Sequence, residues 1–428
     1  MHLMGAGGAG VSALARVFLA RGDDVTGCDL KESKTTADLE DLGMKIAMGH
    51  DPEHVLGQDL LVYSGAIKKS PELDAARAMG VKVLSRAEML ARLINESDSI
   101  AVAGTAGKTT VTHMVGHILV VAGYDPTVLV GDGSSARAGQ SEWLVAETDE
   151  SDGTLTLYRP QRAIVTNIEL DHPDHFRDVS AVRDLFQWFI EGLPKEGLAM
   201  VCADDDLARE LKPKARKLTY GFRNDANYRC EPVRPFPIYR GVDLLGHISL
   251  RQPGRHNIQN ATGAAAMALE LGIGFEDVAA ALRTFPGAHR RMEFLGVFQG
   301  AAVYDDYAHH PTKVRATIEA ARELRHRRLI VVFQPHRYSR LSALMHDFSR
   351  AFVGADRVFV MDTYSAGEEN VSGVRAEDLA HQLPNGLYVG TFERAKESLE
   401  GMVGPDDLVL LMGAGDINKL GDDLAHKI

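Results

Sequence analysis

The chain has 428 residues, 45% of them hydrophobic, and a formal net charge of −12, as expected for a globular protein of about two to four domains. The negative charge argues against a nucleic-acid-binding surface, because phosphate contacts need a basic patch. The cysteines, Cys28, Cys202 and Cys230, are too far apart in sequence for a disulfide framework or a zinc knuckle, and indicate a cytoplasmic protein. No apolar stretch is long enough to predict a membrane span.

A glycine-rich turn follows the first predicted strand, residues 2–4. Its glycines are Gly5, Gly7, Gly8 and Gly10. A helical apolar pattern comes next, and then a strand that ends in Asp29. This pattern is the fingerprint of dinucleotide binding, which by itself suggests an NAD-dependent protein. The same turn can hold any diphosphate at a helix N-terminus, so the ligand stays open. Further strands at 60–67, which include Ser64, and at 81–85 predict a small Rossmann-like domain.

A second glycine-rich turn joins the apolar run 100–103 to another helical pattern. Its residues are Gly104, Thr105, Gly107, Lys108, Thr109 and Thr110. The backbone N–H groups of such a turn favour a polyphosphate, a lysine here reaches the terminal phosphates, and the Thr109 hydroxyl is placed for Mg²⁺. Val102 stands where the general P-loop pattern has glycine. A strand–helix turn with a solvated lysine is the alternative.

Acidic residues follow the next two predicted strands. Strand 143–146 ends before Glu147 and the acids of 149–152, and strand 163–168 ends before Asp171, His172, Asp174 and His175. Carboxylates at the carboxyl end of a strand beside a P-loop suit a Mg²⁺ ligand, and the second group suits another Mg²⁺ or a water-positioning site. An acidic surface loop is the alternative for the first group. Zinc is the alternative for the second, but no H-E-x-x-H pattern supports it.

The remaining chain predicts a β-rich stretch at 218–250, a helix from residue 254 and then alternating strands and helices from 302 to 412. Near the start of the helix, His256, Asn257 and Asn260 are either caps or contacts for a base. The later strands are continuous apolar runs, which indicates a buried parallel sheet. Polar clusters follow four of them, at 305–311, 334–340, 362–368 and 413–416. Ligands of such sheets bind at that edge.

Taken together, these motifs resemble the Mur ligase family over almost the whole chain. The most specific segments are Asp305-Asp-Tyr-Ala-His-His-Pro311 and Gln334-Pro-His-Arg-Tyr-Ser-Arg340, which are similar to the member that adds L-alanine. The resemblance implies an α/β protein of three domains. These are a Rossmann-like UDP-binding domain at 1–95, a central P-loop ATPase-type domain at 96–290, and a C-terminal Rossmann-like domain at 291–428 that binds the amino acid.

The resemblance also implies a reaction. L-alanine is joined to the lactyl carboxylate of UDP-N-acetylmuramic acid through an acyl phosphate, with release of ADP and phosphate, in peptidoglycan precursor synthesis. The implied cofactors are ATP and Mg²⁺, with two Mg²⁺ sites. The partners are these small molecules, with no nucleic acid and no membrane, and the protein is expected to be a cytoplasmic monomer or homodimer.

The family assigns roles to matching residues. The implied catalytic residues are Lys108, His172, His309 and Arg337. ATP is implied to contact Gly104, Thr105, Gly107, Lys108, Thr109, Thr110, Asn257 and Arg291. The UDP-sugar residues are Gly5, Gly7, Gly8, Gly10, Asp29 and Ser64. The amino-acid residues are Tyr307, His310, Arg337 and Arg340. The metal ligands are Thr109, Glu147 and His172. Arg337 and Arg340 are expected to share one face if their segment is helical.

The sequence departs from the family pattern in several places. Ala106 stands where the family usually has histidine, Val111 replaces a hydroxyl residue, and the segments 131–140 and 204–250 are short. Three other functions therefore stay open. A recycling ligase that adds a preformed peptide would need a roomier C-terminal pocket. An NAD(P)-dependent oxidoreductase would leave the P-loop unexplained. A non-catalytic relative is suggested only by Ala106.

Overall fold

The computed structural model describes residues 1–131, 136–150, 153–171 and 176–425. They form two compact units. One runs to Ser249 and also contains Gln259–Phe285, and the other contains Leu250–Ile258 and the chain from Pro286 onward. Each of the three predicted domains has its own sheet, which confirms the α/β class and the three-domain architecture. The predicted boundaries near residues 95 and 290 stay a prediction.

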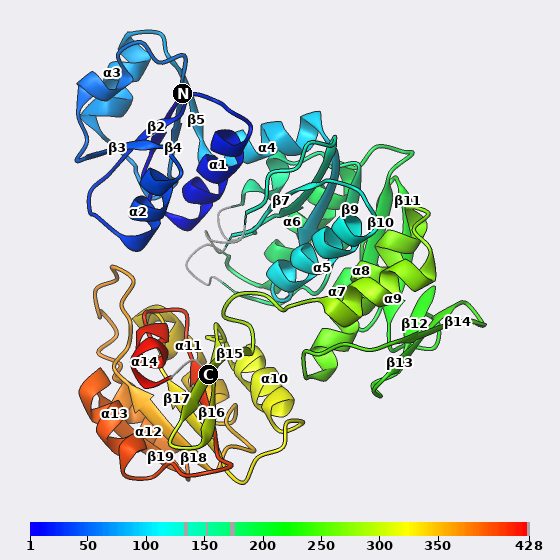
Figure 1. Cartoon of the computed structure of the whole chain (residues 1–428), viewed down its shortest axis with the longest axis vertical. Coiled ribbons are helices and arrows are strands. Elements are labelled where there is room, and N and C mark those ends of the chain that lie inside the picture. Colours follow the sequence, from blue (N-terminus) through cyan, green and yellow to red (C-terminus); the bar gives the residue numbers. More distant parts are fainter. Residues whose placement is uncertain (132–135, 151–152, 172–175, 426–428) are drawn as a thin grey trace. The chain divides into compact units, whose positions relative to one another are not determined.

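The first sheet has five parallel strands in the order β3-β2-β1-β4-β5 (Figure 1). The strands are β1 His2–Met4, β2 Thr26–Asp29, β3 Lys45–Met48, β4 Leu60–Tyr63 and β5 Lys82–Ser85, and the helices are α1 Ala9–Ala20, α2 Lys34–Asp41, α3 Pro71–Ala78 and α4 Arg86–Glu96. Serine side chains cap three of these helices, at Ser33, Ser70 and Ser85, and each satisfies a backbone N–H of the first turn.

The second sheet has nine strands in the order β14-β13-β12-β11-β10-β9-β6-β8-β7. They are β6 Asp98–Ala103, β7 Thr127–Leu129, β8 Trp143–Glu147, β9 Arg162–Val165, β10 Leu198–Cys202, β11 Arg216–Gly221, β12 Tyr228–Cys230, β13 Phe236–Arg240 and β14 Asp243–Ile248. The helices are α5 Lys108–Val121, α6 Val179–Glu191, α7 Asp206–Glu210, α8 Arg255–Glu270 and α9 Phe275–Thr284. Strands β13 and β14 are antiparallel, so the β-rich stretch extends a parallel sheet.

The third sheet has six strands in the order β15-β16-β20-β17-β18-β19. They are β15 Glu293–Phe298, β16 Ala301–Asp306, β17 Leu329–Phe333, β18 Arg357–Met361, β19 Gly386–Gly390 and β20 Leu408–Met412. The helices are α10 Pro311–Ala321, α11 Tyr338–Phe348, α12 Ala376–Gln382, α13 Phe392–Glu400 and α14 Asn418–Leu424. All strand pairs are parallel except β15 with β16. The sequence pattern did not reveal this antiparallel edge strand.

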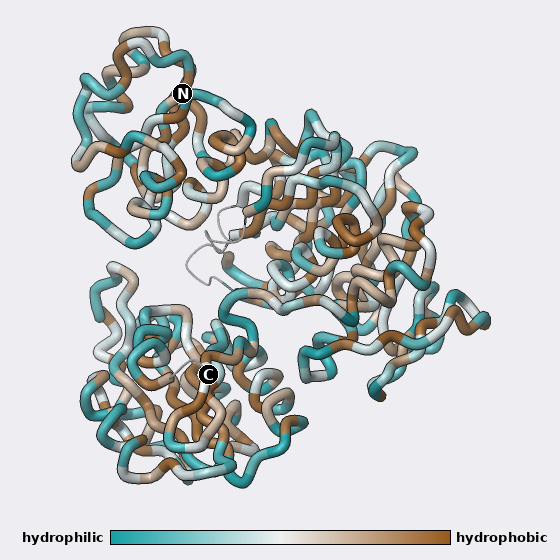
Figure 2. The backbone as a smooth tube through the Cα atoms, in the orientation of Figure 1, coloured by the Kyte–Doolittle hydropathy of each residue, from teal (hydrophilic) through white to brown (hydrophobic). Residues whose placement is uncertain are grey.

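The hydrophobic residues gather in the strands and in the helix faces that cover them (Figure 2). One continuous cluster includes Leu14 and Leu90 of the first domain together with Leu129 and Ala146 of the second. This shared core explains why the first two sheets fall in one compact unit. In the described parts of the chain, no helix has the length and hydrophobicity to cross a membrane.

Asp407 lies just before β20 and forms ion pairs near the amino ends of the strands of the third sheet. Its carboxylate accepts hydrogen bonds from Arg327 Nε at 3.1 Å and from Arg328 Nη2 at 2.6 Å. Burial alone would raise the pKa of Asp407, but the two guanidinium groups hold it well below the usual value. A carboxyl with a depressed pKa stabilises the fold above its unfolded pKa, and this stabilisation is lost as the pH falls below about 4.

We therefore expect Asp407→Asn to lower the free energy of unfolding at pH 7 by about 2 kcal/mol, because charged hydrogen bonds are lost. The difference in the free energy of unfolding between the variant and the wild type should shrink as the pH falls towards 3. Chemical denaturation followed at several pH values measures it. The exposed neighbour Asp406 has a positive φ of 63°, which asparagine tolerates, so Asp406→Asn is the control. A gap that is independent of pH would show that charge is not the cause.

Candidate active site

The central turn after β6 depends on two glycines with positive φ. Gly104 has φ +141°, and a Cβ atom there would lie 1.9 Å from Thr166 Oγ1. Gly107, the N-cap of α5, has φ +87°, and a Cβ atom there would lie 2.7 Å from Asn260 Oδ1. Any side chain at either position clashes, so the chain can turn directly from β6 into α5 only with glycine.

The end of β9 fixes the backbone of this turn. Asn167 Oδ1 accepts a hydrogen bond from the Ala106 N–H at 2.7 Å, and Thr166 Oγ1 donates to the Ala106 carbonyl at 2.6 Å. The Thr105 N–H donates to the Asn167 carbonyl at 3.0 Å. Both polar groups of the Ala106 backbone are therefore held by side chains of the two residues that follow β9. The conformation of the turn does not depend on the side chain at position 106.

Lys108 lies at the first position of α5 among carboxylates. Its Nζ atom is 2.6 Å from Glu150 Oε2 and 3.5 Å from Asp149 Oδ1. Burial would lower the pKa of Lys108, but Glu150, Asp149 and Glu147 together raise it well above its usual value. Lys108 is therefore a charged ammonium group at the N-terminus of a helix, where phosphate oxygens are favoured.

Thr109 and Glu147 lie together, as a shared metal ligand pair requires. Thr109 Oγ1 donates to Glu147 Oε2 at 3.0 Å, and the Gly131 N–H donates to the same oxygen at 3.1 Å. A hydroxyl and a carboxylate are oxygen ligands that suit Mg²⁺. The third predicted ligand, His172, lies outside the described residues.

The N-terminal glycine turn is organised by Asp29. Its Oδ2 atom accepts from the Gly7 N–H at 2.8 Å, and its Oδ1 atom accepts from the Leu30 N–H at 2.7 Å. Gly5 has φ +78°, and a Cβ atom there would lie 2.9 Å from Ser64 Cβ. The structure thus brings Gly5, Gly7, Asp29 and Ser64 together. In this structure the Asp29 carboxylate shapes the turn by bonding its backbone.

Arg86 is a residue of this region that the sequence motifs did not single out. A Cβ atom on Gly10 would lie 2.8 Å from Arg86 Cδ, so this side chain from the start of α4 packs on the glycine turn. A small pocket is lined by Gly10 and Arg86 and also by Gly131 and Glu147. Arg86 therefore places a cation between the glycine turn and the candidate metal ligand. Only the packing of α4 against α1 reveals it.

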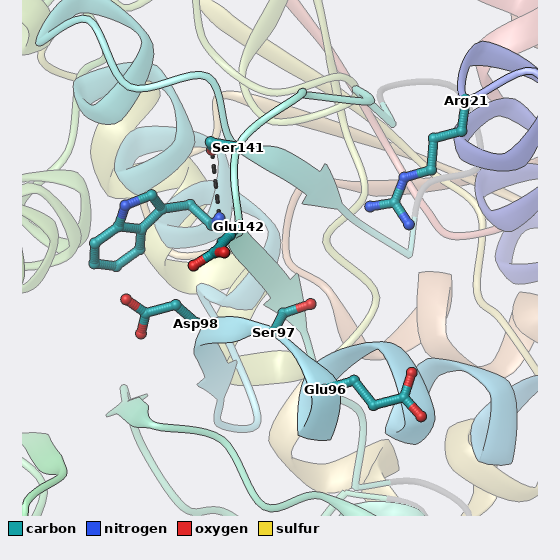
Figure 3. A pocket seen from close by; sticks show the side chains of 7 residues that line it. Arg21, Glu96, Ser97, Asp98, Ser141 and Glu142 are labelled. Atoms are coloured by element: carbon teal, nitrogen blue, oxygen red, sulfur yellow. Dashed lines mark hydrogen bonds between the residues drawn. The ribbon is translucent and has the colours of Figure 1, made fainter.

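A separate polar pocket lies at the amino ends of strands β6 and β8 in the second sheet. It is lined by Arg21, Glu96, Ser97, Asp98, Ser141, Glu142 and Trp143 (Figure 3). Asp98 and Trp143 begin β6 and β8, whereas the glycine turn and Glu147 lie at the carboxyl ends of these strands. This pocket is therefore not part of the candidate phosphate site.

The C-terminal unit brings the predicted polar clusters to one edge of its sheet, as expected. Gln334 Nε2 donates to Asp416 Oδ1 at 2.9 Å, which joins the ends of β17 and β20. The rings of His336 and Tyr364 stack at 5.6 Å between centroids. The ring of His309 lies 5.8 Å from that of His336. Four segments that are far apart in sequence thus build one polar surface.

Two arginines in this unit have different surroundings. Arg337 precedes α11 with φ +67° and ψ +136°, so the expectation that Arg337 and Arg340 share one helix face is wrong. The sequence Gln-Pro-His before Arg337 leaves the strand in a loop, and the helix begins only at Tyr338. Arg337 Nη1 lies 3.5 Å from Glu368 Oε1 and its side chain is one-third exposed. Arg340 is buried, and its Nη1 atom donates to the His336 carbonyl at 3.4 Å.

The other predicted residues of this unit have local contacts. Asn257 Nδ2, in the first turn of α8, donates to the Pro253 carbonyl at 2.7 Å. The guanidinium of Arg291 lies 5.0 Å from the centre of the Tyr307 ring. His310 is the buried N-cap residue of α10.

Arg290 is a second residue outside the predicted site residues, although it adjoins Arg291. Its Nε atom donates to Asp305 Oδ2 at 2.9 Å, and its Nη2 atom donates to the Gly413 carbonyl at 2.6 Å. Burial raises the pKa of Asp305 to about 6 although Arg290 opposes the shift. Arg290 therefore joins the ends of β16 and β20 and supports the polar surface.

Comparison with known proteins identifies this arrangement. Residues 1–98 match the Mur ligase family catalytic domain, residues 102–268 match the Mur ligase middle domain, and residues 290–415 match the Mur ligase glutamate ligase domain. The chain belongs to the Mur ligase family. The glycine turn at 5–10 is thus part of a Mur ligase domain. This match argues against the alternative that the turn belongs to an NAD(P)-dependent oxidoreductase.

Known proteins resemble this Mur ligase over its whole length. It is 40% identical to the UDP-N-acetylmuramate–L-alanine ligase of Geotalea uraniireducens, over 100% of this chain and 98% of that protein. It is 39% identical to the enzyme of the same name from Carboxydothermus hydrogenoformans, over 100% and 96%. The crystal structure of UDP-N-acetylmuramate–alanine ligase from Thermotoga maritima has a TM-score of 0.81 at 28% identity and covers 99% of this chain and 97% of that one. This Mur ligase is an enzyme that uses ATP.

The geometry predicts different effects for the two glycines that flank α5, Gly107 and Gly123. Gly107→Ala should lower kcat by about tenfold or more, because the new Cβ atom displaces Asn260 or the phosphate-binding turn. Gly123, beyond the other end of the helix, has φ +84° and nothing within 4 Å of its added Cβ. Gly123→Ala therefore carries the same backbone strain of about 1–2 kcal/mol without the clash. Phosphate release and nucleotide binding in both variants measure the difference, and equal effects would contradict the clash.

Proposed function

We propose that this Mur ligase joins L-alanine to the lactyl carboxylate of UDP-N-acetylmuramic acid with conversion of ATP to ADP and phosphate, in the synthesis of peptidoglycan precursors. The observation that carries the proposal is the charged Lys108 at the N-terminus of α5, beside the oxygen pair of Thr109 and Glu147. The end-to-end likeness to proteins named UDP-N-acetylmuramate–L-alanine ligase supports the choice of substrates.

In this proposal the central turn binds the phosphates of ATP. The turn that contains Gly104, Thr105, Gly107 and Thr110 surrounds the phosphates, and Lys108 stabilises the γ-phosphoryl group as it moves to the sugar carboxylate. Its ammonium group exchanges the Glu150 carboxylate for phosphate oxygens. Thr109 and Glu147 would hold Mg²⁺, which would supply positive charge to the phosphates. The contacts of ATP with Asn257 and Arg291 that the resemblance implies stay predictions.

The sugar nucleotide occupies the N-terminal glycine turn. The small residues Gly5, Gly7, Gly8 and Gly10 leave room for its diphosphate at the start of α1, where the N-terminus of a helix favours an anion. Asp29 holds the turn in shape, and Ser64 lies beside it. Arg86 adds a positive charge next to Gly10, which favours the same anion.

The alanine site lies on the polar edge of the third sheet. Arg337, partly exposed, binds the alanine carboxylate. The buried guanidinium of Arg340 holds His336, and Tyr307 and His310 complete the surroundings. His309 Nδ1 is 2.8 Å from the Tyr307 carbonyl, which only accepts hydrogen bonds. Nδ1 therefore carries the proton of the neutral ring, and Nε2 is the acceptor for the alanine ammonium proton. The neutral amine then attacks the acyl phosphate.

A second Mg²⁺ with His172 as a ligand, the monomeric or homodimeric state and the cytoplasmic location stay predictions. The tests below also distinguish the alternative of a recycling ligase that adds a preformed peptide. A murein peptide ligase structure from Psychrobacter arcticus has a TM-score of 0.73 at 22% identity, which shows a common fold.

The first test is phosphate release from ATP. We expect release that needs both UDP-N-acetylmuramic acid and L-alanine, and a loss of about a hundredfold or more in Lys108→Ala, because one main cation of the transition state is removed. Lys195 is exposed in the same unit, so Lys195→Ala is the matched control. Release with a tripeptide in place of alanine would instead support the recycling ligase.

The second test concerns the amino acid. Arg337→Ala should raise the KM for L-alanine by about tenfold to a hundredfold, since a charged hydrogen bond is worth about 1.5–3 kcal/mol. The KM for ATP should change little. Arg350, an exposed arginine after α11, provides the control Arg350→Ala. Steady-state kinetics with each substrate varied in turn measures both constants, and an unchanged KM for alanine would remove Arg337 from the site.

A further inference from the structure

A cluster of metal-binding side chains lies in the N-terminal domain outside the proposed reaction. We call His2, Cys28, His54 and Glu72 the N-terminal cluster. His2 begins β1, Cys28 lies near the end of β2, Glu72 belongs to α3, and His54 belongs to the short 3-10 helix Pro52–Val55. His2, Cys28 and Glu72 are buried, at 2%, 0% and 0% exposed. Nothing in the proposed ligase mechanism uses these side chains.

The potential ligand atoms converge on one point. One atom from each of the four residues lies within 4.8 Å of the other three. His2 Nε2 is 2.9 Å and His54 Nδ1 is 3.3 Å from Glu72 Oε1. Cys28 Sγ is 3.4 Å from the same oxygen. Tetrahedral zinc with bonds of about 2.0–2.3 Å places neighbouring ligand atoms about 3.3–3.8 Å apart, so shifts of about 1 Å or less bring these atoms to that geometry.

Two ring nitrogens of the cluster are poorly satisfied as hydrogen-bonding groups. His2 Nε2 and His54 Nδ1 are buried, and among the described residues neither has a hydrogen-bond partner of good geometry. Their contacts with Glu72 are close in distance but not aligned as hydrogen bonds. Buried polar atoms normally find a partner. A cation at the point where these nitrogens converge satisfies both lone pairs together with the Glu72 carboxylate.

An outer layer of contacts orients these ligands. His2 Nδ1 lies 2.8 Å from Thr26 Oγ1, which turns Nε2 towards Glu72. His50 Nδ1 lies 3.1 Å from Glu72 Oε2 and 3.4 Å from Cys28 Sγ. Histidine ligands of metals typically bond a second group through the other ring nitrogen in this way. His50 and His54 have side chains 14% and 20% exposed, so the cluster has an edge at which an ion can enter.

We propose that the N-terminal cluster binds one Zn²⁺ ion per chain through His2, Cys28, His54 and Glu72. Two imidazoles, one thiolate and one carboxylate are ligands that zinc accepts in a closed, structural site. Mg²⁺ and Ca²⁺ fit poorly because they prefer oxygen ligands, and the four residues offer one carboxylate. The Cys28 thiol gives up its proton to solvent when its sulfur binds the ion.

Such an ion would act on the sugar-nucleotide turn through the backbone. The Cys28 carbonyl accepts hydrogen bonds from the Gly5 N–H at 2.9 Å and from the Ala6 N–H at 3.0 Å. The next residue, Asp29, accepts from the Gly7 N–H. Zinc at Cys28 and His2 therefore fastens the two strands that carry the turn. This is a structural role and needs no contact with a substrate.

The test is direct measurement of the metal. The full-length protein is treated with a chelator, given Zn²⁺ and dialysed, and its metal content is determined by mass spectrometry. We expect about one zinc per chain. In competition with a coloured chelator, Cys28→Ser and His54→Gln should weaken zinc binding by at least about tenfold, because even outer contacts of zinc sites are worth that much. Cys202→Ser is the matched control, since Cys202 is equally buried in the second sheet.

Cobalt provides a second readout. Co²⁺ in place of zinc should give a near-ultraviolet charge-transfer band from a thiolate ligand, absent in Cys28→Ser and present in Cys202→Ser. If Cys28→Ser does not fold, the zinc affinity of His54→Gln tests the proposal instead, because His54 is partly exposed and its replacement disturbs the fold less. Less than about one-tenth of a zinc per chain, or wild-type affinity in folded His54→Gln, would overturn the proposal. These readouts need no substrate, so they fail or succeed independently of the proposed ligase activity.

Discussion

The structure depends on the way β9 holds the phosphate-binding turn. Asn167 and Thr166 fix both backbone groups of Ala106, and Gly104 lets the turn approach that strand. This arrangement directs the N-terminus of α5, with its positive dipole and Lys108, towards one point. The carboxylates that follow β8 meet the same point because β8 and β9 both pair with β6. A departure from the family at position 106 is therefore compatible with an intact turn.

Charge is balanced closely in this region. Lys108 is held by Glu150, while Thr109 and Glu147 bond each other. In the proposed mechanism, nucleotide phosphates must therefore compete with a carboxylate for the ammonium group, and the nearby acids repel the phosphates unless a divalent cation is present. This competition gives the requirement for Mg²⁺ a physical reason within the proposed mechanism. It also makes substrate binding an exchange of ion pairs.

Buried polar side chains also hold the loops of the other two proposed sites in place. Asp29 shapes the sugar-nucleotide turn through backbone N–H groups, and Arg290 joins the ends of β16 and β20 in the third sheet. The proposed zinc site extends this principle, since it fastens the strands on which the first turn is built. In each case a buried polar group acts on the backbone of a loop. Binding residues on loops gain their precision from such supports.

The sequence by itself determined the α/β class, the order of most strands and helices, and the glycine turns. These features follow from local periodicity and from short motifs whose glycines have one geometric purpose. The tertiary structure alone brought Asn260 to the P-loop glycine, Arg86 to the first turn, and His2, Cys28, His54 and Glu72 to one point. It also showed Arg337 outside the helix. Pairing and crossover of strands place such residues together, and no local pattern along the chain records that pairing.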